Sequence, residues 1–422
     1  MNDEPVRAPK RGPTLPPALH YGDFRAFWLG QAISLIGTQF TNVAMAWQIY
    51  QITNSALQLG LLGLARAIPQ MALTLVGGML ADAVDRRRIM IATQLGQGTV
   101  AAALVLLTLT DAMSPTALYV ASGLFALFAA LDNPARQAYV PNLVPRADLT
   151  SAIALTTSMR QVSYILGPAL GGVVLAVGGP VWCYGSDVAA RLVAIGLLFT
   201  IRVRQAAGGR RRVSLASLLE GLAFVRSQPT ILWLMVLDFA ANFFGSPRAL
   251  LPIYARDIFQ VGPEGLGILY AASSIGSLSG GLTMSIIGQP RNAGRWILLG
   301  VAFYACSVMA FALSPTFAIA VVLLVLMGLG DTVSSVLRGT INQLLTPDEL
   351  RGRVSAVNSI FVNVGPQLGQ FRAGVAAAWW GTVEAAFTGG LATLIVVGLV
   401  ALVPAVRRFS LPREREKATT SS

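Results

Sequence analysis

Twelve apolar segments constrain this chain more than any other feature of its sequence. Six lie in the first half, at about residues 24–50, 57–81, 89–109, 116–131, 149–177 and 181–201. Six more lie in the second half, at about residues 230–255, 265–287, 296–313, 317–337, 354–380 and 383–406. A hydrocarbon core of about 30 Å needs about 20 apolar residues per helix. The segments therefore predict an all-α integral membrane protein with twelve spans.

The composition agrees with a lipid-embedded chain. Only 12% of the 422 residues are charged and 54% are hydrophobic, whereas a soluble protein carries about 25% charged residues. The net charge of +12 would suggest nucleic acid as the partner of a soluble chain. Here the basic residues lie between apolar segments, so we expect the lipid bilayer as the partner and no nucleic acid.

The basic residues also predict an orientation. If the N-terminus is cytoplasmic, 25 of the 31 Lys and Arg residues fall in the inner segments, and Arg256 alone falls in an outer loop. The positive-inside rule then places both termini in the cytoplasm and the chain in the inner membrane.

The predicted divisions of the chain are a disordered cytoplasmic tail (1–20), an N-terminal bundle (21–202), a cytoplasmic linker (203–228), a C-terminal bundle (229–409) and a cytoplasmic tail (410–422). In the linker, residues 214–224 fit either a helix on the membrane surface or an ordinary solvated segment.

A repeat divides the chain into two halves. Asp132 precedes the Gly-Pro pair at Gly167 by 35 residues, and Asp331 precedes the pair at Gly365 by 34. Matched acids and Gly-Pro pairs in corresponding spans favour duplication of a six-helix unit. Transporters are often built from such repeats, with the substrate site between the halves. The repeat therefore predicts two pseudo-symmetric six-helix bundles.

Several residue types argue against an enzyme or an ATP-driven pump. The only lysines are Lys10 and Lys417, and neither follows a glycine as a phosphate-binding loop requires. The only histidine is His20, which excludes a His-pair metalloprotease. Cys183 and Cys306 lie in apolar segments and are interpreted as packing residues. We expect no enzymatic activity, no cofactor and no metal.

The loop between the second and third spans carries a family motif. Its sequence, GGMLADAVDRRR from Gly77 to Arg88, resembles the signature of the major facilitator superfamily. The resemblance implies that Asp82 docks near the start of the eleventh span and that Asp132 pairs with Arg86. The expected latch, which joins the halves when the protein is open to the outside, comprises Gly78, Asp82, Arg86, Arg87, Asp132 and Arg136. A cluster of inner-surface charges is the simpler alternative.

A second motif ends the fifth span. Residues Gly167, Pro168, Gly171 and Gly172, with Arg160 upstream, resemble the motif of drug and metabolite antiporters. Four other segments, at residues 24–31, 132–137, 248–252 and 369–374, are similar to those of the branch that holds enterobactin-type siderophore exporters and macrolide efflux proteins.

The resemblance implies a monomeric transporter that exports a small amphipathic molecule by alternating access and proton antiport. The expected roles are multidrug resistance or siderophore export. An importer or uniporter of the same fold and a non-transporting membrane scaffold or receptor are the alternatives.

Charged residues inside the spans mark candidate sites, because each costs about 2.5–3.5 kcal/mol at mid-membrane. Asp238 is hypothesised to bind the coupling proton or a cationic substrate group. A structural pair with Arg248 or with an arginine of another helix is the alternative. The predicted cavity residues are Asp238, Asn242, Arg248, Gln31, Gln39, Asn42 and Arg66.

Arginines outnumber acids within the spans. Arg66, Arg160 and Arg372 suit an anionic substrate, or they bind backbone carbonyls where helices break. Asp187 and Arg191 lie four residues apart, so they are expected to neutralise each other on one helix.

Overall fold

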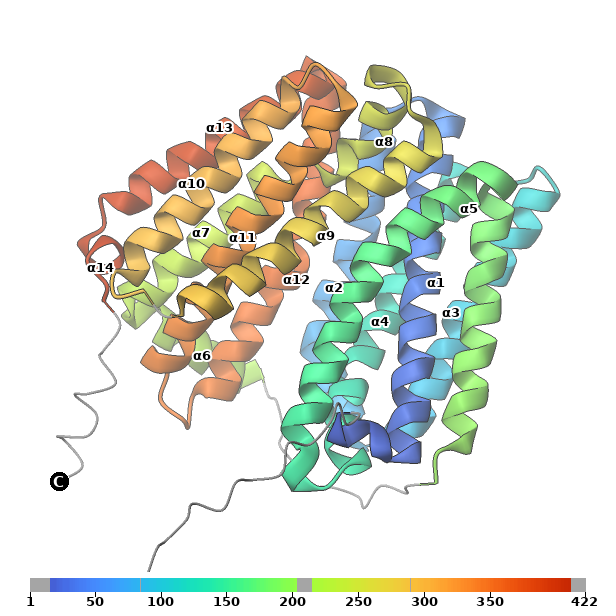
Figure 1. Ribbon diagram of the computed structural model, residues 1–422, viewed down its shortest axis with the longest axis horizontal. Helices are drawn as coiled ribbons and strands as arrows, with labels where there is room; N and C mark the ends of the chain where they lie inside the picture. Colours follow the sequence, from blue (N-terminus) through green and yellow to red (C-terminus); the bar gives the residue numbers. More distant parts are fainter. Residues whose placement is uncertain (1–15, 84, 203–214, 289, 411–422) are drawn as a thin grey trace, which may run out of the picture.

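The structure is a computed structural model that describes residues 16–83, 85–202, 215–288 and 290–410. The side chains of residues 74–83 and 215–218 lie outside that description. Across the described residues the regular structure is helical, and it forms two bundles that stand side by side (Figure 1).

The N-terminal bundle contains the first six spans. Its helices are α1 (Gly22–Thr53), α2 (Ala56–Ala83), α3 (Arg86–Leu109), α4 (Pro115–Leu143) and α5 (Leu149–Thr200). α5 holds two spans, because Gly179 has a φ of 68° and is followed by Pro180. A positive φ is readily adopted by glycine, so the chain reverses here without a longer loop.

The C-terminal bundle contains the other six spans, and the first of them is broken. α7 (Pro229–Gly245) is followed by the short elements η3 (Arg248–Leu250), α8 (Leu251–Ile253) and the π-helical η4 (Tyr254–Ile258). Pro247 and Pro252 lack an N–H for the helical ladder, which explains the break. The remaining spans are α9 (Gly262–Ile287), α10 (Ala293–Ala312), α11 (Phe317–Leu345), α12 (Arg351–Trp380) and α13 (Thr382–Ala401), followed by the short α14 (Pro404–Arg407).

The prediction of twelve spans in two six-helix bundles is confirmed. Among the described residues, eight helical segments are long and apolar enough to cross a membrane, and one of them contains both spans of α5. α1, α9 and α12, of 32, 26 and 30 residues, are not among those segments, and they complete the twelve spans. α1 and α12 contribute most of the amide side chains at the central cavity described below.

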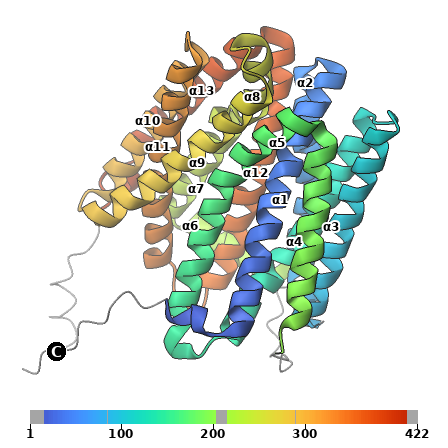
Figure 2. The same cartoon turned by 45° about the vertical axis from the view of Figure 1, so that its right-hand side comes forward.

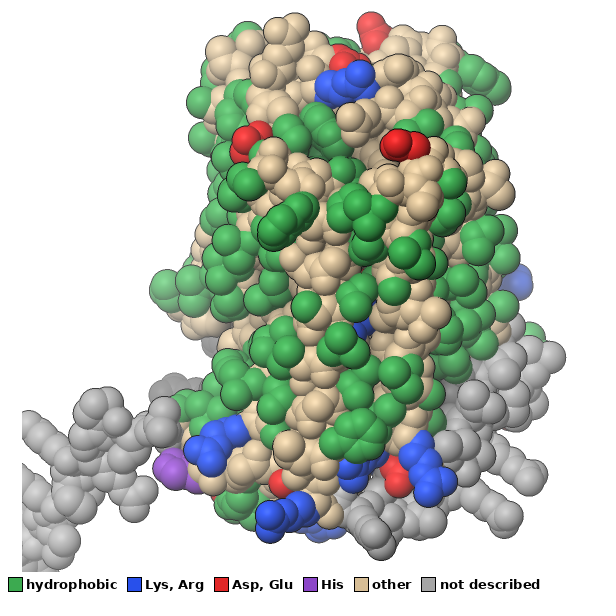
Figure 3. All heavy atoms as spheres, turned by 90° about the vertical axis from the view of Figure 1, so that its right-hand side faces the viewer, with side chains coloured by type: hydrophobic (Ala, Val, Ile, Leu, Met, Phe, Trp, Pro, Cys, Tyr) green, Lys and Arg blue, Asp and Glu red, His purple; other side chains and the backbone are tan. Residues whose placement is uncertain are grey.

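The outer surface of the bundles suits lipid. Val177 and Ile286 are each 86% exposed, and many other large apolar side chains face outward. On the face shown in Figure 3, apolar side chains cover the middle of the molecule, while Lys and Arg gather mostly at the lower rim. An apolar belt between polar ends is the surface that a bilayer requires.

The bundles approach each other most closely at one end, called here the η4 end. A Cβ built on Gly60 of α2 would lie 2.9 Å from Cα of Gly374 in α12, and one built on Gly172 of α5 would lie 2.8 Å from Cα of Gly267 in α9. The Tyr50 hydroxyl donates to the Asp257 carboxylate at the same end. Toward the opposite end, where α6 lies, the bundles diverge (Figures 1 and 2).

The structure describes part of the N-terminal tail and part of the linker. Residues 1–15 lie outside the described residues, but Pro17–His20 forms the 3-10 helix η1, because Ala18 is buried and its N–H donates to Ser151 Oγ. In the linker, α6 (Leu215–Ser227) packs on α12 through buried Val225 and a Glu220–Arg353 ion pair. This part of the linker is therefore helical, and its position on the membrane surface stays a prediction.

Candidate functional site

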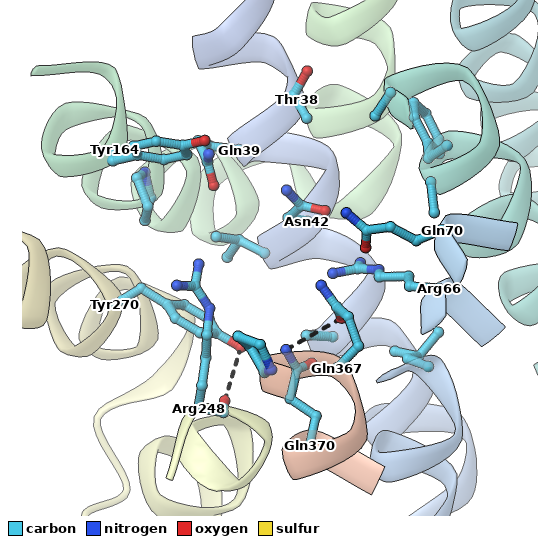
Figure 4. A pocket seen from close by; sticks show the side chains of 18 of the residues that line it. Thr38, Gln39, Asn42, Arg66, Gln70, Tyr164, Arg248, Tyr270, Gln367 and Gln370 are labelled. Carbon is cyan, nitrogen blue, oxygen red and sulfur yellow. Dashed lines mark hydrogen bonds between the residues drawn. The ribbon is translucent and has the colours of Figure 1, made fainter. Parts of the chain in front are cut away.

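A cavity of about 430 Å³ lies between the two bundles, and many of its lining side chains are polar. This volume is within the range of small-molecule sites. The labelled lining side chains in Figure 4 come from α1, α2, α5, η3, α9 and α12, and they are Thr38, Gln39, Asn42, Arg66, Gln70, Tyr164, Arg248, Tyr270, Gln367 and Gln370.

Two arginines from opposite bundles reach this cavity. Nε of Arg66 donates to Ser122 Oγ at 2.6 Å. The Arg248 guanidinium stacks over the Tyr270 ring at 5.3 Å from its centroid, and the Tyr270 hydroxyl donates to the Arg248 carbonyl. Among the described residues, neither arginine has a carboxylate within ion-pair distance.

The carboxylate at this cavity is already engaged. Asp132 is 3% exposed, forms an ion pair with Arg136 and accepts a hydrogen bond from Thr93 Oγ1 at 2.9 Å. Arg86, its expected partner, donates to the Ala138 carbonyl at 2.6 Å. In this conformation Asp132 therefore contacts Arg136 in place of Arg86.

Of the remaining latch residues, Gly78, Asp82 and Arg87, only Arg87 has a described side chain. Arg87 donates to the Phe199 carbonyl at 3.1 Å. Gly78 and Asp82 lie on α2, but their side chains are outside the described residues. The latch is expected when the η4 end is open, so it stays a prediction.

The glycines of the antiporter-like motif form packing surfaces. A Cβ on Gly167 would lie 2.7 Å from Cβ of Gln39, and Gly171 packs against Phe40. Gly172 forms the close crossing with α9, and Pro168 lines the central cavity. Arg160 is exposed and is not among the residues that line the described cavities.

A buried ionic network supports the wall of the cavity within the N-terminal bundle. Arg191 and Asp187 form an ion pair at 3.1 Å, as expected from their spacing, and both are fully buried. Arg191 also donates to Gln94, Gln97 and Thr38. Because Thr38 and Gln97 line the cavity, the network fixes the polar wall to the core of the bundle.

A second cavity, of about 280 Å³, lies largely against the C-terminal bundle and is lined by Asn242, Arg248 and Asp331 among others. Asp238 is adjacent to this region and pairs with Arg338 of α11 at 2.6 Å. Arg338 lies 3.9 Å from Asp331. Asp238 thus has the partner from another helix that was the alternative to a proton site.

The structure brings together most of the predicted cavity residues. Gln39, Asn42, Arg66 and Arg248 line the central cavity, and Asn242 lines the second one. Gln31 is buried and lies outside both linings. Arg372 donates to the Phe244 carbonyl at 2.7 Å, where α7 ends, which agrees with the backbone-carbonyl alternative.

Some lining residues were missed by sequence reasoning. Gln70, Tyr164, Tyr270 and Gln367 carry no charge, and similar side chains occur throughout the spans. The sequence offered a signal for one of these residues: Gln367 directly follows the Gly365-Pro366 pair of the repeat.

Two six-helix bundles around a central cavity, together with the family match of the sequence, identify a multi-pass membrane transporter of the major facilitator superfamily, not an enzyme. The fold is shared with the peptide transporter POT, solved as a mutant, at a TM-score of 0.75 and 13% identity, covering 96% of this chain and 98% of that chain. An inward-facing bacterial homologue of the human lysosomal transporter Spinster has a TM-score of 0.70 and 16% identity, covering 93% and 96%.

The sequence comparisons give the family. Residues 14–422 match the model of the transmembrane secretion effector family. The enterobactin exporter EntS of Shigella boydii serotype 18 is 30% identical over 387 residues, which cover 92% of this chain and 93% of that protein. EntS of Escherichia coli O1:K1 has the same identity and coverage. The chain belongs to the transmembrane secretion effector family.

Proposed function

We propose that this chain exports a small amphipathic molecule from the cytoplasm by alternating access, with proton antiport as the driving reaction. The observation that carries the proposal is the central polar cavity between two bundles that touch mainly at the η4 end. A cavity of this kind becomes accessible from the other side when the two bundles rock about it.

The direction is supported by charge and by similarity. The basic residues favour a cytoplasmic position for the α6 end, so the divergent end of the bundles would face the cytoplasm and receive cargo from it. The similarity to enterobactin exporters supports export by this chain. Drugs, macrolides and siderophore-like molecules are the proposed cargo.

Transport by purified chain in liposomes tests this function. Fluorescent drugs, a labelled macrolide and a catecholate siderophore are placed on the side that carries the α6 end. The solution on the η4 side is made more acidic, so that protons flow in the direction opposite to the cargo. We expect movement toward the η4 side that accelerates with the gradient and stops when a protonophore collapses it.

A deletion and an overexpression strain separate the alternatives in cells. Export predicts that the deletion strain accumulates the cargo and becomes more sensitive to it. Greater accumulation on overexpression would establish an importer. Absence of transport for every compound, with no substrate-induced change in trypsin cleavage of the 202–226 segment, would favour a scaffold or receptor.

A further inference from the structure

We propose that Arg66 and Arg248 form a two-sided clamp for an organic anion, with one guanidinium supplied by each bundle. Arg66 lies on α2 and Arg248 on η3, and Figure 4 shows both side chains at the same cavity. The inference rests on the proposed function, because the anion would be the cargo of that cavity.

The charge of the cavity favours an anionic ligand. Three arginines line it, at positions 66, 136 and 248, against the single aspartate Asp132 among the described residues. The Asp132 carboxylate is engaged by Arg136 and Thr93. A positive excess inside the membrane is costly, so a ligand that carries its own negative charge offsets this cost when it binds.

Each guanidinium is oriented by the protein without a bound acid. Arg66 uses Nε to reach Ser122, and among the described residues its two terminal nitrogens have no hydrogen-bond partner. The face of the Arg248 guanidinium packs on the Tyr270 ring, which leaves the N–H groups at the edge of the guanidinium plane for a ligand. A planar guanidinium matches a carboxylate with two parallel hydrogen bonds. Carboxylates and other small oxyanions are therefore the ligand groups that fit.

The neutral lining completes an amphipathic site. Gln39, Asn42, Gln367 and Gln370 provide amide N–H groups, and Phe125 and Leu62 provide apolar surface. Amides can donate to the anion and also accept from hydroxyl groups of the ligand. The site thus suits an organic anion with an aromatic or aliphatic body.

The placement of the arginines couples binding to the conformation of the protein. Because one arginine belongs to each bundle, the affinity for an anion that binds both depends on the relative position of the bundles. A ligand shifts a conformational equilibrium only by binding one state more tightly than the other. The clamp supplies such a difference, since separating the arginines weakens one of its two contacts.

A matched pair of probes tests the charge preference. Binding of naphthoate and of its uncharged analogue naphthamide to the purified full chain in detergent is measured by calorimetry. We expect naphthoate to bind at least about tenfold more tightly, because hydrogen bonds to charged groups contribute about 1.5–3 kcal/mol. Equal affinities would overturn the proposal.

Substitutions test the two arginines. We expect Arg66→Gln and Arg248→Gln each to weaken naphthoate binding about tenfold or more, with little effect on naphthamide. Arg66→Lys and Arg248→Lys, which keep the charge, should recover part of the affinity. Arg146→Gln, at an exposed position in η2 (Arg146–Asp148), is the control.

The double variant tests whether both arginines hold the same anion. Residues that share one ligand show non-additive effects, so Arg66→Gln with Arg248→Gln should lose less than the product of the single losses. Wild-type affinity in either single variant, or fully multiplicative losses, would overturn the clamp. Because binding is measured without transport, a chain that binds naphthoate but exports nothing would refute only the proposed function.

Discussion

The buried charge of Arg191 is held by several partners. Arg191 is fully buried, yet it contacts Asp187, Gln94, Gln97 and Thr38. Removing one member of a buried ion pair is more damaging than removing both, because the other charge is left without its counterion.

Arg191→Met should therefore destabilise the fold by about 3–5 kcal/mol, measured by denaturant unfolding in detergent micelles. Among the described residues, Asp187 would keep only the Thr41 hydroxyl, which donates to it at 2.9 Å. The double variant Asp187→Asn with Arg191→Met should recover part of the loss. A single variant as stable as the parent chain would show that the pair does not support the bundle.

The acids of α7 and α11 share one arginine, and this arrangement gives the proton hypothesis a defined test. Asp238 pairs with Arg338, and Asp331 lies 3.9 Å from the same arginine. If Asp238 carries the coupling proton, Asp238→Asn should abolish acceleration by a proton gradient while exchange without a gradient continues. Asp348→Asn, an exposed position before α12, is the control. Unchanged pH-dependent transport in Asp238→Asn would leave Asp238 as a structural partner only.

At the scale of helices, glycine pairs decide how closely the bundles meet. The crossings of α2 with α12 and of α5 with α9 bring backbones together at Gly60, Gly374, Gly172 and Gly267. Small residues permit such close approach in membranes. The η4 end is closed by these crossings together with the Tyr50–Asp257 hydrogen bond.

Gly172→Ala should open the η4 end. Its Cβ would lie 2.7 Å from the Pro263 carbonyl oxygen, and overpacking typically costs about 1–3 kcal/mol. We expect faster thiol labelling of Ala46→Cys in the cavity by a reagent added at the η4 side. Gly185→Ala in the same helix meets nothing within 4 Å and is the matched control. Equal labelling rates in the two variants would show that this crossing does not control closure.

At the scale of the whole molecule, the orientation in the membrane is the property on which the proposed direction of transport depends. Ala112 follows α3 at one end of the molecule, and Arg202 follows α5 at the other, and both are exposed. The positive-inside rule predicts that Arg202 faces the cytoplasm.

Single cysteines test this orientation in a background of Cys183→Ser and Cys306→Ser. An impermeant thiol reagent added to intact cells should label Ala112→Cys and spare Arg202→Cys until the membrane is permeabilised. Labelling of both from one side would contradict the twelve-span topology, and labelling of Arg202→Cys alone would reverse the proposed direction.

Sequence alone determined the spans, the division into two bundles and several of the polar positions. These properties follow from local composition, because a bilayer demands long apolar segments and places arginine at its inner boundary. The repeat marked by Asp132 and Asp331 is also a pattern along the sequence, so it identified the duplicated halves without any tertiary contact.

Only the tertiary structure decided which polar residues meet. Within lipid, the packed face and the lipid-facing side of a helix are both apolar, so periodicity does not separate Gln31, which is buried in packing, from Gln39, which lines the cavity. The partners of Asp132 and Asp238, and the meeting of Arg66 with Arg248 across two bundles, depend on contacts between distant segments. Sequence spacing carries no information about such contacts until the helices are packed.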